Sequence, residues 1–484
     1  MRDVRSGAPS LPSGLMRRLW PTLLLVLLLL AATAGTAAGH ATLVRSDPPA
    51  GGTVEEAPAA VRLVFSEPVQ LLAPEDVDVV DEDGEPVSSA GGRVAADRRV
   101  IEVPLQPGLP DGTYTVFYRV IGADSHVIPS LFPFGIGVEP GPPVVGDAGG
   151  GPSETGPWGV AARFLELVTL GGLFGLIAFR WAVWTPAWRR AEGVPDGERD
   201  RLVTWWRDTH WMAFGVLALA AMVAQGLGLL VQTAIALGVG VMDAARDTAG
   251  ISTVLDETDF GGHVQVRAAV LFFVFALGAL QFMREYGTGR ASVRATVSGG
   301  PWAALVIGAL VLAVIGSISA QGHAGVSEAP WLQVGAQLVH IGAAAIWVAG
   351  LALVGLVLAR APRLAPVSGR GLAGHVLLAF SAAATLSILA IAATGVVRTV
   401  AELGDPAELW ATGYGRSILI KLGLLVPLVA LALHNRRVLA ALRGVERPNV
   451  ATVALVRRTV GAELAIALAI VLVATLLVAQ VPGG

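Results

Sequence analysis

Two histidines and an aspartate are the residues whose types and spacing best suit metal chemistry. His40 follows an apolar leader that ends in Ala37-Ala-Gly39, so removal of the leader would make it the first residue. A terminal histidine offers a metal its imidazole and its free α-amine, and these nitrogen donors suit copper(II). Alone, this position is more typical of a histidine that merely follows a cleavage site.

Asp124 and His126 form a second donor pair, in the stretch Gly122-Ala-Asp-Ser-His. They lie two positions apart, so an extended backbone would direct both side chains to one side, where they could close on one ion. Taken alone, the pattern is more typical of a turn-capping aspartate beside a surface histidine. Combined with a histidine at a processed terminus, it predicts a metal site.

The composition requires most of the chain to lie in lipid, because 54% of the 484 residues are apolar and only 15% are charged. A net charge of -3 and the lack of a dense basic run argue against a nucleic-acid partner. The sequence contains no cysteine, which excludes disulfides and thiolate metal sites. Any metal must be held by nitrogen, oxygen or thioether donors.

Residues 1–39 have the features of a signal peptide. Arg17 and Arg18 precede an apolar run over residues 23–32, and small residues stand before His40. A run of about ten apolar residues is too short for a spanning helix, which needs roughly 20. We therefore predict cleavage before His40, with an uncleaved membrane anchor as the alternative.

Residues 40–139 predict an all-β, immunoglobulin-like sandwich. Short β-type runs alternate with Pro, Gly and acidic residues, and Asp83-Gly84 and Asp111-Gly112 supply turns. The predicted strands are 61–65, 77–80, 100–103 and 113–120. In the last strand one face, which we expect to lie in the core, consists of Tyr114, Val116, Tyr118 and Val120.

Residues 140–157 are mostly Gly, Pro, Ser and acidic residues and predict a flexible linker. The rest of the chain, 158–482, predicts an all-α membrane domain of eight transmembrane helices, because eight apolar segments are long enough to cross a bilayer. These segments are 158–182, 210–233, 264–283, 301–320, 331–358, 373–397, 416–434 and 460–480.

Arginines predict the orientation of these spans. The loops after the first, third, fifth and seventh spans are rich in arginine, whereas the alternate loops are acidic or neutral. The arginines are Arg189, Arg190, Arg199, Arg201, Arg207, Arg284, Arg290, Arg294, Arg360, Arg363, Arg370, Arg436, Arg437, Arg443, Arg447, Arg457 and Arg458. This bias predicts a multi-pass protein of the cytoplasmic (inner) membrane, with the sandwich and the C-terminus outside.

The histidines of the membrane domain divide into two groups by side. The outer group consists of His263, His323 and His340, and the inner group of His210, His375 and His434. Ionisable side chains inside spans commonly mark a pathway, although a hydrogen-bonded packing role suits the outer group equally. For the inner group we expect an interfacial location. Lys421, Glu166 and Glu463 also lie inside spans, and the sequence assigns them no role.

Three motifs resemble the CopC family of periplasmic copper-binding β-sandwiches, in the family's order. They are His40-Ala-Thr-Leu-Val-Arg-Ser-Asp-Pro-Pro-Ala-Gly, Phe65-Ser-Glu67-Pro and Tyr118-Arg-Val-Ile-Gly-Ala-Asp124-Ser-His126. The resemblance covers residues 40–138 and implies a copper(II) site formed by the amine and imidazole of His40 with Asp124 and His126, while Glu67 matches a carboxylate near the metal. Some CopC proteins also hold copper(I) through a methionine-rich loop. No methionine lies in this sandwich, so we expect copper(II) alone.

The membrane half resembles the CopD copper-transport domain over most of residues 158–480. The matching residues are Gly322-His323-Ala324, His340, Ile346-Trp-Val-Ala-Gly350-Leu, Phe380-Ser381, Thr394-Gly395, Tyr414-Gly-Arg416, Lys421 and Glu463. A CopC sandwich fused to a CopD domain resembles the YcnJ-type copper-uptake proteins, which implies capture outside and delivery inward.

We therefore expect a copper-acquisition protein rather than an enzyme, in which the sandwich passes copper to an entrance near His263, His323 and His340. No G-x-x-x-x-G-K-[ST] loop is present, so a gradient or trapping inside the cell would drive movement. A copper chaperone that loads the site is a candidate partner. Three alternatives stay open: sequestration or resistance without transport, a haem-type redox protein, which would need two histidines at matching depth, and a purely structural membrane protein.

Overall fold

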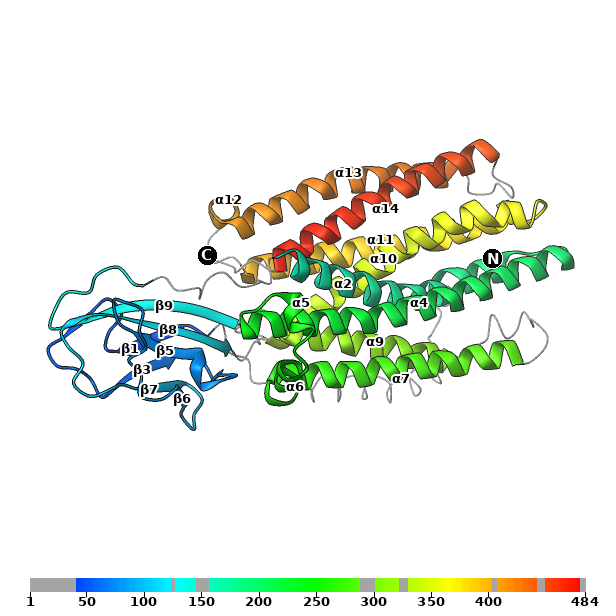
Figure 1. Cartoon of the computed structure of the whole chain (residues 1–484). Helices are drawn as coiled ribbons and strands as arrows, with labels where there is room; N and C mark the ends of the chain where they lie inside the picture. The colour runs from blue at the N-terminus through cyan, green and yellow to red at the C-terminus, as the bar shows by residue number, and fades with distance from the viewer. Residues whose placement is uncertain are drawn as a thin grey trace, which may run out of the picture.

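A β-sandwich lies at one end of a bundle of long helices in the computed structural model (Figure 1). The structure describes residues 41–122, 127–144, 156–287, 301–321, 330–402, 407–441 and 449–478. The predicted signal peptide lies outside these residues, as does most of the predicted linker. Four candidate ligands or path residues also lie outside them: His40, Asp124, His126 and His323.

Two sheets form the sandwich, which confirms the predicted fold of this part. One sheet has the strand order β1-β3-β7-β6, and the other has the order β2-β9-β8-β4 with β5 also paired to β8. The strands are β1 Leu43–Asp47, β2 Thr53–Val54, β3 Ala60–Phe65, β4 Val69–Gln70, β5 Val77–Val80, β6 Arg93–Val94, β7 Val100–Pro104, β8 Gly112–Gly122 and β9 Val127–Ile136. The predicted core face of β8 is buried, since Tyr114, Val116, Tyr118 and Val120 are each at most 7% exposed.

Strand β9 was not predicted, because it contains Pro129 and Pro133. It pairs with β8 from Val127 to Ile136, whereas its other neighbour, β2, reaches only Gly135 and Ile136. Both prolines therefore lie along an edge that needs few ladder hydrogen bonds, where proline is tolerated. The β8–β9 pair places Gly122 and Val127, the residues on either side of the Asp124-x-His126 segment, at one end of the sandwich.

Eight helices in the described parts of the chain are long and apolar enough to cross a membrane, as predicted. The first comprises α2 (Pro157–Phe179), the π-helical turn η3 (Arg180–Trp184) and α3 (Thr185–Arg190). The others are α4 (Asp196–Leu237), α7 (Asp259–Gly287), α9 (Pro301–Gln321), α10 (Pro330–Leu364), α11 (Gly369–Glu402), α13 (Gly413–Ala441) and α14 (Val450–Val478). Three short helices lie at the sandwich end: α5 (Val241–Ala244), α6 (Thr248–Glu257) and α12 (Glu408–Ala411) (Figure 1).

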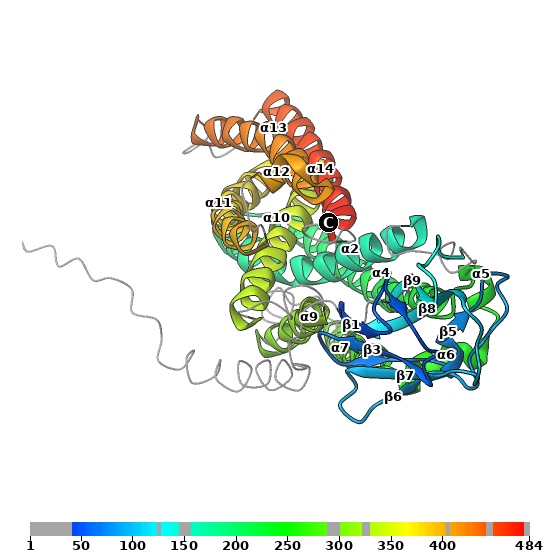
Figure 2. The same ribbon diagram turned by 90° about the vertical axis from the view of Figure 1, so that its left-hand side faces the viewer.

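The long helices form two adjoining groups. In the first group α2, α4, α7 and α9 pack around one apolar core, and in the second group α10 packs against α11 and α14 while α13 packs against α14. Helix α10 joins the groups through contacts with α2 and α9. Viewed from the sandwich end, the sandwich lies beside α4, α6 and α7 of the first group, away from α11 and α13 (Figure 2).

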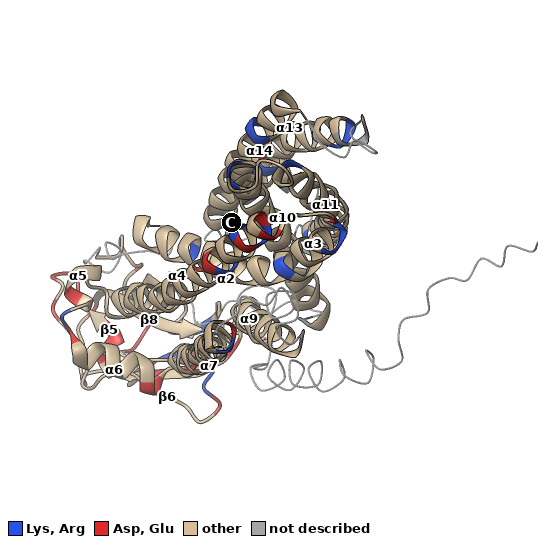
Figure 3. Cartoon of the chain, turned by 90° about the vertical axis from the view of Figure 1, so that its right-hand side faces the viewer, with Lys and Arg blue, Asp and Glu red and all other residues tan. Residues whose placement is uncertain are grey.

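Positive charge gathers at the end of the bundle opposite the sandwich, which faces the viewer in Figure 3. The arginines at these helix ends in the described chain include Arg189, Arg190, Arg284, Arg360, Arg363, Arg436, Arg437, Arg457 and Arg458. The helix order thus puts the arginine-rich connections on one side and the sandwich on the other.

Candidate copper site and polar clusters of the membrane domain

The described neighbours of the candidate copper ligands meet at one end of the sandwich. The backbone N–H of Thr42 donates to Oγ of Ser66 at 3.0 Å, and the N–H of Ser66 donates to the carbonyl of Thr42 at 2.9 Å. Three residues further on, Val69 pairs with Gly122 in the β4–β8 ladder. Since these residues flank His40, Glu67 and Asp124 in the chain, three segments that carry candidate ligands converge there.

Glu67 is the candidate ligand that the structure describes, and its side chain is only 1% exposed. It stands between Ser66 and the start of β4, within the convergence of the three segments. Because Glu67 is buried, bulk water does not compete with a metal ion for its carboxylate oxygens. Among the described residues no group of three or more His, Cys, Asp or Glu side chains lies close enough to hold a metal ion.

The same end of the sandwich packs on the membrane domain. Ile121 and Val127, which flank the Asp124-x-His126 segment, belong to an apolar cluster with Ala236 at the end of α4 and Val254 on α6. We call this cluster the docking core; its remaining members are Leu72, Leu229 and Phe260. The chain that carries the Asp-x-His motif is therefore anchored on both sides against the helices.

Gly238 allows the close approach at this junction. It ends α4 in the left-handed conformation, with φ +67°, and a Cβ atom there would lie 2.5 Å from the guanidinium of Arg119 on β8. A non-glycine residue would be strained in this conformation and would displace the arginine.

Polar contacts place the start of α7 beside the docking core. Arg98 of the sandwich forms an ion pair with Asp259 at 3.4 Å, and the N–H of Asp259 donates to the side chain of Gln70 at 3.4 Å. One turn later, Nδ1 of His263 lies 2.6 Å from the carbonyl oxygen of Asp259. Because a carbonyl can only accept, Nδ1 carries the proton and Nε2 is the nitrogen that could bind a metal.

His340 lies in the second helix group, on α10. Its Nδ1 is 3.0 Å from Oγ1 of Thr394 on α11, and that hydroxyl donates to the carbonyl of Ala390 at 2.6 Å. Nδ1 therefore donates to the threonine, which again leaves Nε2 as the basic nitrogen. The positive charges of Arg398 and Lys421 act on this histidine, so its surroundings disfavour the binding of a metal cation.

A buried ion pair that the sequence interpretation missed lies in the first group, near the arginine-rich end. Arg180, in the π-helical turn, contacts Glu285 of α7 at 2.5 Å, and the side chains are 8% and 5% exposed. The indole N–H of Trp211 donates to the other oxygen of Glu285 at 2.8 Å. The signal available was Arg180 itself, a charged residue at the end of an apolar run.

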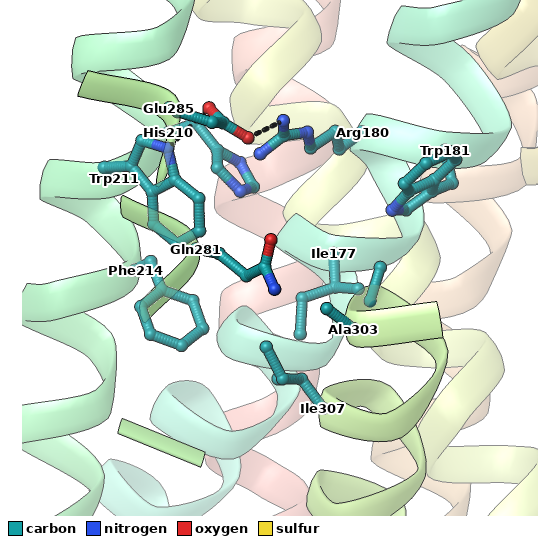
Figure 4. A pocket seen from close by; sticks show the side chains of 11 residues that line it. Ile177, Arg180, Trp181, His210, Trp211, Phe214, Gln281, Glu285, Ala303 and Ile307 are labelled. Atoms are coloured by element: carbon teal, nitrogen blue, oxygen red, sulfur yellow. Dashed lines mark hydrogen bonds and ion pairs between the residues drawn. The ribbon is translucent and has the colours of Figure 1, made fainter. Parts of the chain in front are cut away.

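His210 borders the same cluster, and it is buried between helices rather than exposed at a helix end. Helix α4 begins at Asp196, so position 210 lies several turns inside the helix, and the side chain is only 4% exposed. Figure 4 shows His210 with Arg180, Glu285 and Gln281 around a cavity of about 30 Å³, which is room for one water. The charges of Arg180 and Glu285 in this cluster neutralise each other.

A second cluster of polar side chains lies in the half of the first group nearer the sandwich. Glu166 of α2 accepts a hydrogen bond from Gln225 of α4 at 2.5 Å, and Arg267 of α7 donates to Gln321 of α9 at 2.7 Å. The charges of Arg163 and Arg267 act on Glu166, so this carboxylate has cationic neighbours. Each of the four helices contributes a side chain.

The second group contains a carboxyl group of a different kind. Glu463 of α14 is 3% exposed and accepts a hydrogen bond from the amide of Asn435 on α13 at 2.5 Å. It borders a cavity of about 230 Å³ between α10, α11, α13 and α14. Five residues of the motifs that resemble CopD line this cavity: Trp347, Leu351, Phe380, Ser381 and Glu463 itself.

Models of three protein families match consecutive parts of the chain. A CopC domain matches residues 43–137, a copper resistance protein D-like N-terminal domain matches 154–334, and copper resistance protein D matches 374–477. This chain is a CopC–CopD fusion protein. The resemblance predicted from the sequence motifs is confirmed, and the matched families comprise copper-binding and copper-transport proteins rather than enzymes.

Individual relatives of the CopC–CopD protein were also found. The copper transport protein CutJ of Bacillus subtilis is 28% identical over 422 residues, which cover 86% of this chain and 71% of CutJ. The structure of CopC from Methylosinus trichosporium OB3b is 25% identical and covers 22% of this chain and all of that one, with a TM-score of 0.18. The Escherichia coli copper resistance protein PcoC is 26% identical and covers 20% of this chain and 98% of its own, with a TM-score of 0.17.

Proposed function

We propose that this CopC–CopD protein acquires copper by capturing copper(II) outside the cytoplasmic membrane and passing it to the membrane domain for import. The proposed ligands are the α-amine and imidazole of a processed His40 together with Asp124 and His126, with Glu67 near the metal. One observation carries the proposal: the segments that bear these residues converge at the end of the sandwich that packs on the helices.

The chemistry of the donors supports the oxidised ion. Imidazole, amine and carboxylate donors suit copper(II), whereas copper(I) prefers the sulfur of cysteine or methionine. The chain has no cysteine, and its methionines lie outside the sandwich. The sandwich therefore offers a site for copper(II) and none for the softer ion.

His263 is the first acceptor that we propose in the membrane domain. It lies one turn after Asp259, which contacts the sandwich through Arg98 and Gln70, and its Nε2 is the basic nitrogen. Copper leaving the sandwich would have a short path to this ring. His323 and His340 remain further candidates along the path, although Arg398 and Lys421 make the surroundings of His340 the less favourable for a cation.

The distribution of charge supports the proposed orientation. Arginine-rich connections stay on the cytoplasmic side of membrane proteins, and here they lie at the end opposite the sandwich (Figure 3). The sandwich and the C-terminal end of α14 would then lie outside the cytoplasmic membrane, where a cleaved leader would deliver the sandwich. A copper chaperone could load the site from that side.

Titration of the purified full-length protein with copper(II), followed by electron paramagnetic resonance, tests the proposed ligands. We expect one tight site with nitrogen hyperfine structure, loss of that site in His126→Ala, and an intact mass that begins at His40. A different first residue, or a His126→Ala variant that binds as the wild type does, would overturn the ligand set. An absorption spectrum without a Soret band would exclude the haem alternative.

Copper accumulation in cells separates import from sequestration. Cells that produce the wild-type protein should accumulate more copper than cells without it, and His263→Ala should lose most of this gain while keeping the copper(II) site of the sandwich. His434→Ala, an exposed histidine at the opposite end, is the matched control and should behave as the wild type. Accumulation that is unchanged in His263→Ala would favour sequestration by the sandwich alone.

A further inference from the structure

Glu463 is buried and has one described hydrogen-bond partner. Its one described hydrogen bond comes from Nδ2 of Asn435, at 2.5 Å. The hydroxyl of Thr459 donates to Oδ1 of the same amide at 2.6 Å, which fixes the amide so that its N–H group faces the carboxyl. The side chain of Glu463 is 3% exposed, so bulk water does not solvate it.

Other acidic groups of the membrane domain are stabilised as anions. Glu285 pairs with Arg180 and also accepts from Trp211. Glu198, near the start of α4, accepts from the backbone N–H groups of Val367 and Ser368 and from a hydroxyl. Among the described residues Glu463 has neither a cationic partner nor a set of donors, and a carboxyl group in such surroundings favours its protonated form.

The cavity beside Glu463 is large enough to hold water, which could accept a proton from the carboxyl group. Its volume of about 230 Å³ has room for several waters, and hydroxyl and amide groups of Ser381, Thr385 and Asn435 line it. Arg436, at the arginine-rich end of α13, is the other charged residue among the described lining. Helices α10 and α11 contribute no ionisable side chain to the described lining.

We propose that Glu463 is a proton-exchange site that gives copper movement a proton-coupled step. The resting group is the acid, with Oε1 accepting from Asn435. Release breaks the carboxyl O–H bond and passes the proton to a cavity water as hydronium, leaving a carboxylate that the N–H group of Asn435 stabilises. The coupling to copper rests on the proposed import function, whereas the proton site itself does not.

Labelling with dicyclohexylcarbodiimide tests the proton site directly, because this reagent modifies protonated carboxyl groups in apolar surroundings. The purified full-length protein would be labelled over a range of pH and the modified peptides identified by mass spectrometry. We expect Glu463 to react severalfold faster than Glu285, with a rate that falls as the pH rises. Equal rates for the two residues, or no reaction at Glu463, would overturn the proposal.

Copper accumulation in proteoliposomes tests the coupling. We expect the wild-type rate to depend on the pH difference across the membrane, and Glu463→Gln, which keeps the shape of the group, to lose that dependence. A Glu463→Gln variant with wild-type pH dependence would refute the coupling. If the wild type accumulates no copper at all, the import function fails, while the labelling result still decides whether Glu463 exchanges a proton.

Discussion

The two helix groups of the membrane domain treat buried charge in opposite ways. In the first group Arg180 neutralises Glu285 around a cavity of about 30 Å³, and the sandwich docks at the opposite end of this group. In the second group Glu463 has an amide partner and borders a cavity of about 230 Å³. The first group therefore has the features of a scaffold that holds the sandwich, and the second contains the proposed proton-exchange site.

Replacing Glu285 should have the largest effect on stability. Glu285→Gln leaves the guanidinium of Arg180 buried without its counter-charge, which costs about 3–5 kcal/mol. The same change in the other group, Glu463→Gln, keeps the bond from Asn435 and should shift the unfolding midpoint little. Thermal unfolding of both variants in detergent measures the difference.

Equal shifts of the unfolding midpoint in Glu285→Gln and Glu463→Gln would show that the two groups do not differ in how they stabilise a buried carboxyl group. Replacing both partners, as in Arg180→Met with Glu285→Met, should regain much of the loss, because no buried charge then remains.

The packing of α10 against α11 gives the next largest effect. A Cβ atom on Gly350 would lie 2.2 Å from the ring of Phe380, so Gly350→Ala should destabilise the second group by about 1–3 kcal/mol. Gly423→Ala on α13 is the matched control, since no described atom lies within 4 Å of its new methyl group, and it should be neutral or stabilising. Addition of Phe380→Leu should relieve the clash, and a double-mutant cycle without coupling would contradict this contact.

Much of this architecture could be predicted from the sequence, because hydropathy and period-two patterning act over neighbouring residues. The eight spans and the buried face of β8 follow from such local patterns. The pairing of Arg180 with Glu285 and the docking of Ile121 on Ala236 and Val254 join residues about a hundred positions apart, and no local pattern encodes them.

Strand β9 could not be predicted from local patterns either. Its prolines predict a break in the strand, and they are tolerated only because β2 pairs with no more than the end of β9. For the candidate site, the convergence of the segments that carry His40, Glu67 and Asp124 needed the strand register, whereas the residue types were visible in the sequence. The ligand set itself stays a prediction.

A substitution at the junction between the sandwich and the first group should destabilise the protein less than the substitution at Gly350. Gly238→Ala places a side chain in the left-handed conformation and against Arg119, at a cost of about 1–2 kcal/mol. Because the chain has no cysteine, an introduced pair, Ile121→Cys with Val254→Cys, reports docking through the yield of a short thiol cross-linker. The yield should fall in Gly238→Ala and stay unchanged in Gly226→Ala, within the same helix.

The ion pair between Arg98 and Asp259 should have the smallest effect. The side chains are 43% and 53% exposed, and solvent screening limits such a pair to about 0–1 kcal/mol. Asp259→Asn should therefore leave the cross-linking yield of the introduced cysteine pair nearly unchanged, at low and at high salt. A yield that collapses in this variant, or with added salt, would mean that charge rather than the apolar docking core holds the sandwich on the first group. The two groups would then differ less than their buried charges suggest, because the attachment of the sandwich would depend on surface charge instead of on the packing of the scaffold.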